Sequence, residues 1–294
     1  MRFSEALNKF KTFLQEEGRS KSTIIAYSKD ISQLTNYLNK FENLENIKNI
    51  KTEHLNNYVK MIKSDKKKDY TLKTVSRKIN SMKTFFKFLC SEKVTNNDPA
   101  NAVDHPKYEV STPRVFSKME YSALRDVARS NKRLYTIVEV LLQTGIRIGE
   151  LARLNIEDLN LEGNKKKMKI REYGSNPSRK VKLSQQAVAA FKKYLNIRPQ
   201  ASEGVSSVFI TKNGNTLLVR NIRTSITRAL EKIGIKDATV NDIRNTFIVH
   251  QLKHGMPIEV LSNIVGHKRL TSTKRYLQLI ENKPKRKTNK IVPL

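Results

Sequence analysis

The most constraining feature of the sequence is a series of short apolar stripes near its end, separated by glycine and proline. Ile243, Phe247 and Leu252 fall on a roughly helical stripe within residues 242–253, which predicts a helix. Gly255 suits the position just after that helix, and Pro257 suits the first turn of a second one. Gly266 then closes the second helix. The pattern predicts a compact group of short helices.

Three chemically active side chains lie around these turns. Arg244 is in the first helix, His267 directly follows Gly266, and a third helix after Thr271 is expected to carry Tyr276. A guanidinium, an imidazole and a phenol held together are what a phosphoryl-transfer site with a tyrosine nucleophile needs.

The charge of the chain indicates a polyanionic partner. The 294 residues include 57 Lys and Arg against 27 Asp and Glu, a formal net charge of +30. Nucleic acid is the commonest partner of such a protein, although a basic protein from an AT-rich genome is an alternative. Cys90 is the only cysteine, which excludes an internal disulfide and a cysteine metal cluster. With no membrane-length apolar run and no secretion signal at the start, we expect a cytoplasmic protein.

Residues 1–104 predict an all-helical DNA-binding domain with four amphipathic helices. The first ends near Gly18, the second is capped by Ser22 or Thr23, and the third follows Thr52. The fourth helix has a polar side that is suited to phosphate contacts or is simply solvated. Its candidate DNA-binding residues are Lys73, Arg77 and Lys83, with Thr71 and Ser76 beside them.

A proline-marked connector, residues 105–114, predicts a linker before a second domain at 115–294. Ser117 and Glu120 form a capping box that opens this domain. Helices are expected at 118–130, 132–143, 149–154, 184–195 and 219–233, with a hairpin of strands at 166–173 and 179–183 and a small strand at 208–210. The fold class is therefore mainly α with a small β-sheet. A charged run from Asn282 leads to an apolar end that is suited to docking on a partner.

Four ordered motifs carry a family resemblance. They are TGIRIGEL at 144–151, DIRNTF at 242–247, VGH at 265–267 and TKRY at 273–276. In order and spacing they resemble the tyrosine recombinases, or phage-integrase family, of the Xer-like or transposon-encoded resolvase type. The N-terminal half resembles the family's four-helix, SAM-like core-binding domain, so the likeness covers nearly the whole chain and implies a catalytic α+β domain at 115–294.

The resemblance implies a role for each matching side chain. Arg147 and Arg244 would neutralise the non-bridging phosphate oxygens, which suits the two-pronged donors of guanidinium groups. His267 would bond a phosphate oxygen or take the tyrosine proton, and Tyr276 would be the nucleophile. Glu150 would orient these groups.

Each residue also has a structural interpretation. Arg147 would contact carbonyls at a helix end, and Arg244 would pair with Glu150 or Asp242. His267 would cap the preceding helix, and Tyr276 would pack against Leu277 or Ile280.

Two positions depart from the family. The residue three before Arg244 is usually His or Lys, and here it is Asn241, which donates a hydrogen bond but carries no proton. We retain Asn241 as a catalytic candidate. The family's catalytic lysine, at the hairpin tip, falls on Gly174. Lys169 and Lys180 flank the tip, and we favour Lys180.

The expected function is site-specific recombination of double-stranded DNA through a 3′-phosphotyrosyl intermediate. The resemblance implies a homo-tetramer on DNA, with the segment from Ile291 to Leu294 docking in trans, and chemistry that needs neither metal nor cofactor. Integration, excision, inversion and the resolution of mobile elements or chromosome dimers remain open as biological roles. The alternatives are a DNA-binding protein that has lost catalysis on this scaffold, and a type IB topoisomerase.

Overall fold

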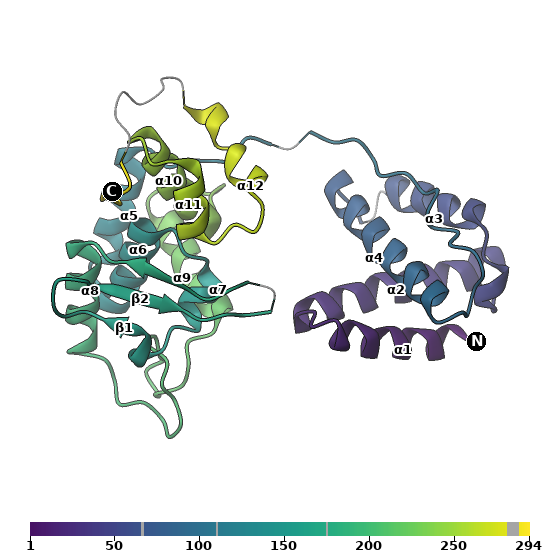
Figure 1. Ribbon diagram of the computed structural model, residues 1–294, viewed down its shortest axis with the longest axis horizontal. Coiled ribbons are helices and arrows are strands. Elements are labelled where there is room, and N and C mark those ends of the chain that lie inside the picture. The colour runs from purple at the N-terminus through teal and green to yellow at the C-terminus, as the bar shows by residue number, and fades with distance from the viewer. Residues whose placement is uncertain (66–67, 110, 175, 281–287) are drawn as a thin grey trace. The chain divides into compact units, whose positions relative to one another are not determined.

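The computed structural model describes residues 1–65, 68–109, 111–174, 176–280 and 288–294 (Figure 1). The chain divides into two units, Met1–Ser111 and Thr112–Leu294. The finer boundaries expected from the sequence, with a linker at 105–114, stay a prediction. Among the described residues, no helix has the length and apolar character to cross a membrane.

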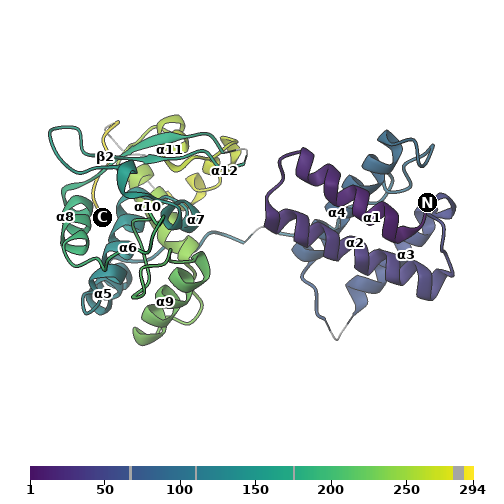
Figure 2. The same ribbon diagram turned by 90° about the horizontal axis from the view of Figure 1, so that it is seen from below.

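The first unit is a group of four helices, as predicted (Figure 2). They are α1 (Phe3–Glu16), α2 (Lys21–Glu42), α3 (Thr52–Ser64) and α4 (Leu72–Ser91), with a short 3₁₀ turn at Ile47–Asn49. Phe10 of α1 and Phe85 and Phe86 of α4 are fully buried in the shared core. The predicted cap of α2 was wrong, because Ser20 is the residue whose hydroxyl accepts the Thr23 N–H, at 3.2 Å.

The second unit consists of helices with a small antiparallel sheet packed against them on one face. The helices are α5 (Lys118–Ala128), α6 (Lys132–Thr144), α7 (Ile148–Ala152), α8 (Gln185–Leu195), α9 (Val219–Lys232), α10 (Val240–Lys253), α11 (Ile258–Val265) and α12 (Thr271–Lys274). The capping box of Ser117 and Glu120 opens α5 as predicted. The buried helix α6 contacts α5, α8 and α10, which makes it the centre of this unit.

The sheet has the order β1–β2–β3, from β1 (Leu159–Asn160), β2 (Lys167–Ile170) and β3 (Arg179–Lys182). The hairpin of β2 and β3 confirms the predicted pair of strands, although Ser175 of its turn lies outside the described residues. Sequence periodicity missed the two-residue β1. The small strand expected at 208–210 was wrong, since only an isolated bridge between Ile210 and Thr216 forms there.

The C-terminal helices differ from prediction at one important residue. The third helix, α12, ends at Lys274, so Tyr276 follows it and precedes a 3₁₀ turn at Leu277–Leu279. A four-residue helix is too short to reach the tyrosine.

The apolar C-terminal end packs on its own unit. Gln251 holds the backbone of Val292 through hydrogen bonds of 2.7 and 2.9 Å, and Arg125 donates to the Leu294 carbonyl at 2.9 Å. The start of the charged run, residues 282–287, lies outside the described residues. Docking of this segment on another subunit stays a prediction.

Candidate active site

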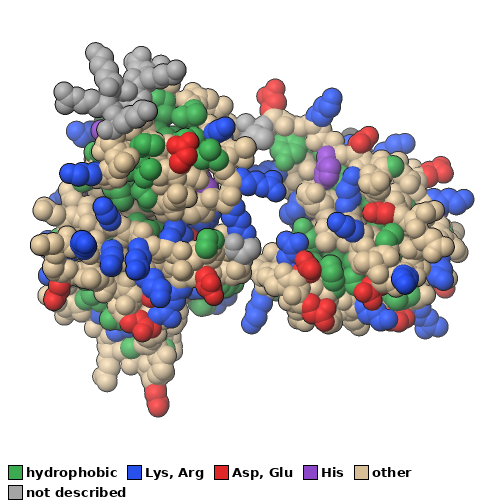
Figure 3. Space-filling model, viewed as in Figure 1, with side chains coloured by type: hydrophobic (Ala, Val, Ile, Leu, Met, Phe, Trp, Pro, Cys, Tyr) green, Lys and Arg blue, Asp and Glu red, His purple; other side chains and the backbone are tan. Residues whose placement is uncertain are grey.

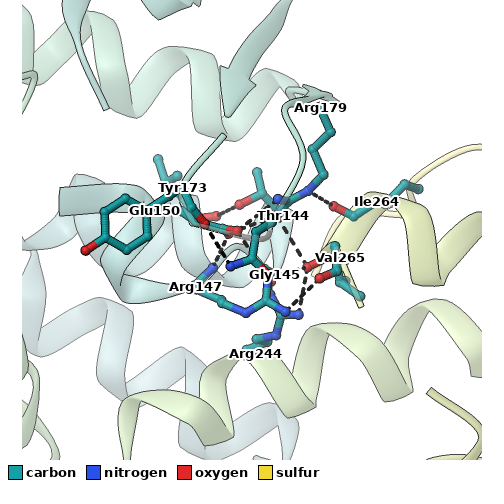
Figure 4. A network of polar contacts seen from close by, with 12 residues as sticks. Thr144, Gly145, Arg147, Glu150, Tyr173, Arg179, Arg244, Ile264 and Val265 are labelled. Atoms are coloured by element: carbon teal, nitrogen blue, oxygen red, sulfur yellow. Dashed lines mark hydrogen bonds and ion pairs between the residues drawn. The ribbon is translucent and has the colours of Figure 1, made fainter. Parts of the chain in front are cut away.

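The candidate site lies where the turn before α7 meets the end of α11 (Figure 4). Gly145 ends α6 with a φ of 58°, a left-handed conformation that favours glycine. A side chain at this position would overlap the ring of Phe247 on α10. This close approach brings the Arg147 turn against the helix that carries Arg244.

Arg147 is held by a carboxylate and by helix-end carbonyls. Its guanidinium donates to Glu150 at 3.1 Å and to the Gly266 carbonyl at 2.7 Å, while its backbone N–H donates to Glu150 at 2.8 Å. The carbonyl contacts of the structural interpretation are therefore present. A guanidinium has five N–H donors, so Arg147 keeps donors that can bind a phosphate.

Arg244 reaches the same point from α10. Its side chain is 8% exposed and donates to the carbonyls of Gly145 and Val265, the latter at 2.7 Å. The ion pair with Glu150 or Asp242 considered as an alternative does not form among the described residues. Burial, followed by the nearby Arg147 charge, lowers the pKa of Arg244 to about 9. Burial and neighbouring positive charge disfavour the charged form of Arg244, and a bound anion would stabilise it. Arg244 therefore suits an anion-binding site.

A third arginine, Arg179, completes this cluster and was not predicted. It forms two parallel hydrogen bonds with Glu150, of 2.9 and 2.8 Å, and donates to the Ile264 carbonyl at 2.8 Å. Strand alternation was the available signal, because Arg179 shares the inward face of β3 with the buried Val181. An arginine at an inward position requires a buried partner.

His267 follows the left-handed Gly266 that ends α11. Its Nδ1 lies 2.7 Å from the Thr273 hydroxyl, so the imidazole bonds to α12, while the backbone N–H of His267 caps α11 by donating to the Ser262 carbonyl at 2.9 Å. Burial, and then the charges of Arg244 and Arg147, lower the pKa of His267 to about 4. The ring is therefore neutral near pH 7 and can accept a proton or share one.

Tyr276 lies beside this cluster with its ring inward. The side chain is 6% exposed, packs with Phe247 and Ile280 in an apolar cluster, and stacks parallel to His267 with ring centres 6.4 Å apart. Its hydroxyl donates to the Asn245 side chain at 2.8 Å. Burial raises the pKa of Tyr276, and the charges of Arg275 and Arg244 oppose that shift.

One pocket of about 410 Å³ unites most of the predicted residues. Arg147, Arg244, His267 and Asn241 line it. Asn241 is exposed, so its amide is free to turn toward a ligand. Arg171, which sequence reasoning did not select, also lines the pocket and pairs with Asp158 at 2.8 Å.

The structure does not bring Lys180 into this pocket. Lys180 points from the outward face of β3, the face opposite Arg179, and lines a separate hollow among other lysines. Lys169 shares that outward face. Gly174 lies in the hairpin turn with a φ of 54°.

The candidate DNA-binding residues of α4 differ in how they are engaged. Lys73 is exposed, whereas Lys83 donates to the Asn101 carbonyl at 3.1 Å. Arg77 is 44% exposed but pairs with the buried Asp30, which neutralises part of its charge. Their contacts with DNA stay a prediction.

Among the described residues, no three His, Cys, Asp or Glu side chains are grouped as a metal ion would need.

Comparison with known proteins agrees with this architecture. Residues 114–283 match the phage integrase family, and residues 7–93 match the family's N-terminal SAM-like domain. The chain belongs to the phage integrase family. It is a tyrosine recombinase, an enzyme that cuts and rejoins DNA at specific sites. The predicted fold class, a SAM-like domain followed by a mainly helical catalytic domain with a small sheet, is confirmed.

Relatives of similar length cover nearly the whole chain. The tyrosine recombinase XerC of Roseiflexus castenholzii is 26% identical and matches 90% of this chain and 85% of its own. XerA of Pyrococcus furiosus is 27% identical over 94% and 90%.

Two solved structures are also similar. A crystal structure of XerA recombinase is 26% identical, with a TM-score of 0.53, and the match covers 93% of both chains. The Tn1549 transposon integrase with transposon right-end DNA has a TM-score of 0.76 over 94% of both chains, but only 18% identity, so that likeness concerns the fold.

Proposed function

We propose that Tyr276 is the nucleophile of the recombinase and that Arg147, Arg244 and His267 hold the phosphate it attacks. The observation that best supports this proposal is that two guanidiniums and a neutral imidazole line one pocket, with the phenol ring stacked on that imidazole. Guanidinium donors aimed at developing phosphate charge are the dominant catalytic device in such transfers.

In the proposed step, the Tyr276 oxygen attacks phosphorus and the bond from phosphorus to the 5′ oxygen breaks. A 3′-phosphotyrosyl ester forms, the phenol proton passes to a base, and the 5′ oxygen takes a proton from solvent water and leaves as a hydroxyl. His267 is placed to receive the phenol proton, because its imidazole lies beside the ring and a bound phosphate would offset the arginine charges that help to lower its pKa. Attack by a 5′ hydroxyl reverses the step and restores the tyrosine.

The position of Tyr276 is that of a resting nucleophile. Its hydroxyl bonds to Asn245, and the phenol does not line the phosphate pocket. The tyrosine must therefore exchange Asn245 for the phosphate before attack. Tyr276 lies in the short connection between α12 and the 3₁₀ turn at Leu277–Leu279, and a shift of that connection would carry the phenol to the pocket.

We also propose that the chain binds a specific double-stranded site as a homo-oligomer, a tetramer when two sites exchange strands. Solved relatives include XerH bound to its palindromic difH substrate and a lambda integrase dimer bound to a core site. The net charge of +30 supports DNA as the partner. A cytoplasmic location stays a prediction.

The test is covalent trapping on a nicked suicide substrate that carries the recombination site. The native chain should form a protein–DNA adduct, and Tyr276→Phe should form none while retaining its affinity for DNA. An adduct in Tyr276→Phe would refute the nucleophile. No adduct with the native chain would favour a scaffold that has lost catalysis, and relaxation of supercoiled DNA without exchange would favour a topoisomerase.

A further inference from the structure

The outward face of the small sheet is occupied by lysines. Lys167 lies opposite Lys182, and Lys169 lies opposite Lys180, in the register of β2 and β3. Opposed residues of an antiparallel pair project to the same side, so these four side chains form a two-by-two group. We call it the lysine face. On β1 the residue that joins this side is Asn160, opposite Lys167, so the three strands place no carboxylate on it.

The two faces of the hairpin are chemically opposite. Met168, Ile170 and Val181 are buried on the inner face. Lys169, Lys180 and Lys182 are exposed, and Lys167 is half-buried. Figure 3 shows Lys and Arg side chains gathered over the sheet of this unit.

Stability alone does not account for this arrangement. Like charges directly opposite one another destabilise a sheet, and lysine is a poor strand former. Among the described residues, none of the four lysines forms an ion pair that would offset the repulsion. Lysines on an edge strand do prevent strands of different molecules from pairing, which would explain Lys180 and Lys182. Protection of an edge strand does not explain Lys167 and Lys169, because they lie on β2, the central strand.

The charge continues into the loop before β2. Lys165 and Lys166 join Lys167, Lys180 and Lys182 around a hollow of about 570 Å³. Three of the four lysines of the face thus border a concave cationic surface, whereas Lys169 lines a neighbouring pocket that also contains Asp158 and Glu172.

We propose that the lysine face binds the phosphate backbone of duplex DNA at a stretch other than the phosphodiester being cut. The inference rests on the proposed function, since it takes DNA as the substrate. Arg179 and Lys180 are neighbours on β3 and point to opposite faces. The phosphate held by the arginine cluster is thus out of reach of the lysine face, which needs a different part of the same duplex or a second duplex.

The dimensions of the face fit a phosphate backbone. Adjacent strands are about 4.8 Å apart and alternate residues about 6.7 Å apart, and the flexible lysine stems extend this reach. One DNA strand presents a charge about every 3.4 Å along the helix axis, so four lysines can each meet a phosphate.

The test compares variants that remove two charges each, K167Q/K182Q and K169Q/K180Q, using a short labelled duplex of random sequence. We expect weaker binding, and a slope of log K against log salt that falls by about 1.8 per pair, from about 0.9 for each phosphate that is no longer neutralised. The matched control is K192Q/K193Q, which removes two exposed lysines from α8 of the same unit. This control variant should change the slope by less than half as much as either lysine-face variant does. Equal slopes for all three variants would overturn the proposal.

A thermal melt separates a binding role from a structural one. Removing like-charge repulsion should raise the melting temperature of the lysine-face variants or leave it unchanged, while their affinity for DNA falls. A lower melting temperature in both pairs would overturn the proposal, as would competition by polyglutamate but not by unlabelled duplex.

If the native chain bound no duplex, the proposed function itself would fail. If it formed the adduct but the lysine variants bound normally, only the lysine face would be refuted.

Discussion

Arg179 on β3 and Glu150 on α7 form a two-pronged ion pair, with side chains only 12% and 7% exposed. Glu150 also accepts the backbone N–H of Arg147, at 2.8 Å. Burial raises the pKa of Glu150, but hydrogen bonds and charge from Arg179, and then from Arg147, outweigh it and leave the pKa below its usual range. A charged carboxylate thus connects the hairpin to the turn that presents Arg147.

Arg179→Leu should destabilise the second unit strongly. The substitution leaves Glu150 buried with a smaller share of its partners, and breaking a buried pair on one side costs about 3–5 kcal/mol. Urea denaturation of the full chain measures the loss. The control is Arg129→Leu, which breaks an ion pair with Asp126 whose side chains are 70% and 65% exposed and should cost about 0–1 kcal/mol. Similar losses in the two variants would show that Arg179 does not support Glu150.

Gly266→Ala should disturb the site more than an equivalent glycine change elsewhere. Gly266 has a φ of 71°, and a Cβ there would lie 2.7 Å from Cζ of Arg179. Gly234 has a φ of 78° and open space around it. Gly234→Ala should therefore cost only the left-handed strain, about 1–2 kcal/mol, and leave the adduct rate unchanged. Gly266→Ala should cost more and slow adduct formation, as measured on the suicide substrate. Equal effects would mean that Arg179 moves aside freely.

Much of the fold could be predicted because its signals are local. The capping box of Ser117, the breaks at Gly255 and Gly266, and the alternation of β2 and β3 each depend on neighbours in the sequence. The small strand expected at 208–210 failed because strand pairing depends on a distant partner, and only an isolated bridge formed there.

The candidate site was predictable only in part, for the same reason. Motif spacing identified Arg147, Arg244 and His267, and the structure places all three on one pocket. Arg179 was missed because its importance depends on Glu150, 29 residues earlier in the chain. The pose of Tyr276, bonded to Asn245, depends on how α12 ends, which no local pattern revealed.

Acidification should weaken the fold through two histidines. Burial is the main reason that the pKa values of His250 and His267 are lowered to about 4, from the ordinary 6.5. The charge of His254 adds to the shift of His250, and the charge of Arg244 adds to the shift of His267. Between pH 6.5 and 4 the unfolded chain binds protons that the folded chain does not, so stability falls as the pH is lowered through that window. Urea midpoints at about pH 7 and about pH 4.5 measure the change. His267→Gln should reduce the difference between the two midpoints, and an unchanged difference would contradict the shifted pKa.

Asn245→Ala should accelerate the first chemical step. The hydrogen bond from Tyr276 to Asn245, at 2.8 Å, exists only in the resting pose, so it stabilises the ground state and not the transition state. A neutral hydrogen bond contributes about 0.5–1.5 kcal/mol, which predicts adduct formation about 2- to 13-fold faster in a single turnover. Asn213→Ala, in an exposed loop, is the control and should match the native rate. A slower Asn245→Ala variant would instead show that the amide assists the attack, because removing a hydrogen bond made only at rest cannot raise the barrier.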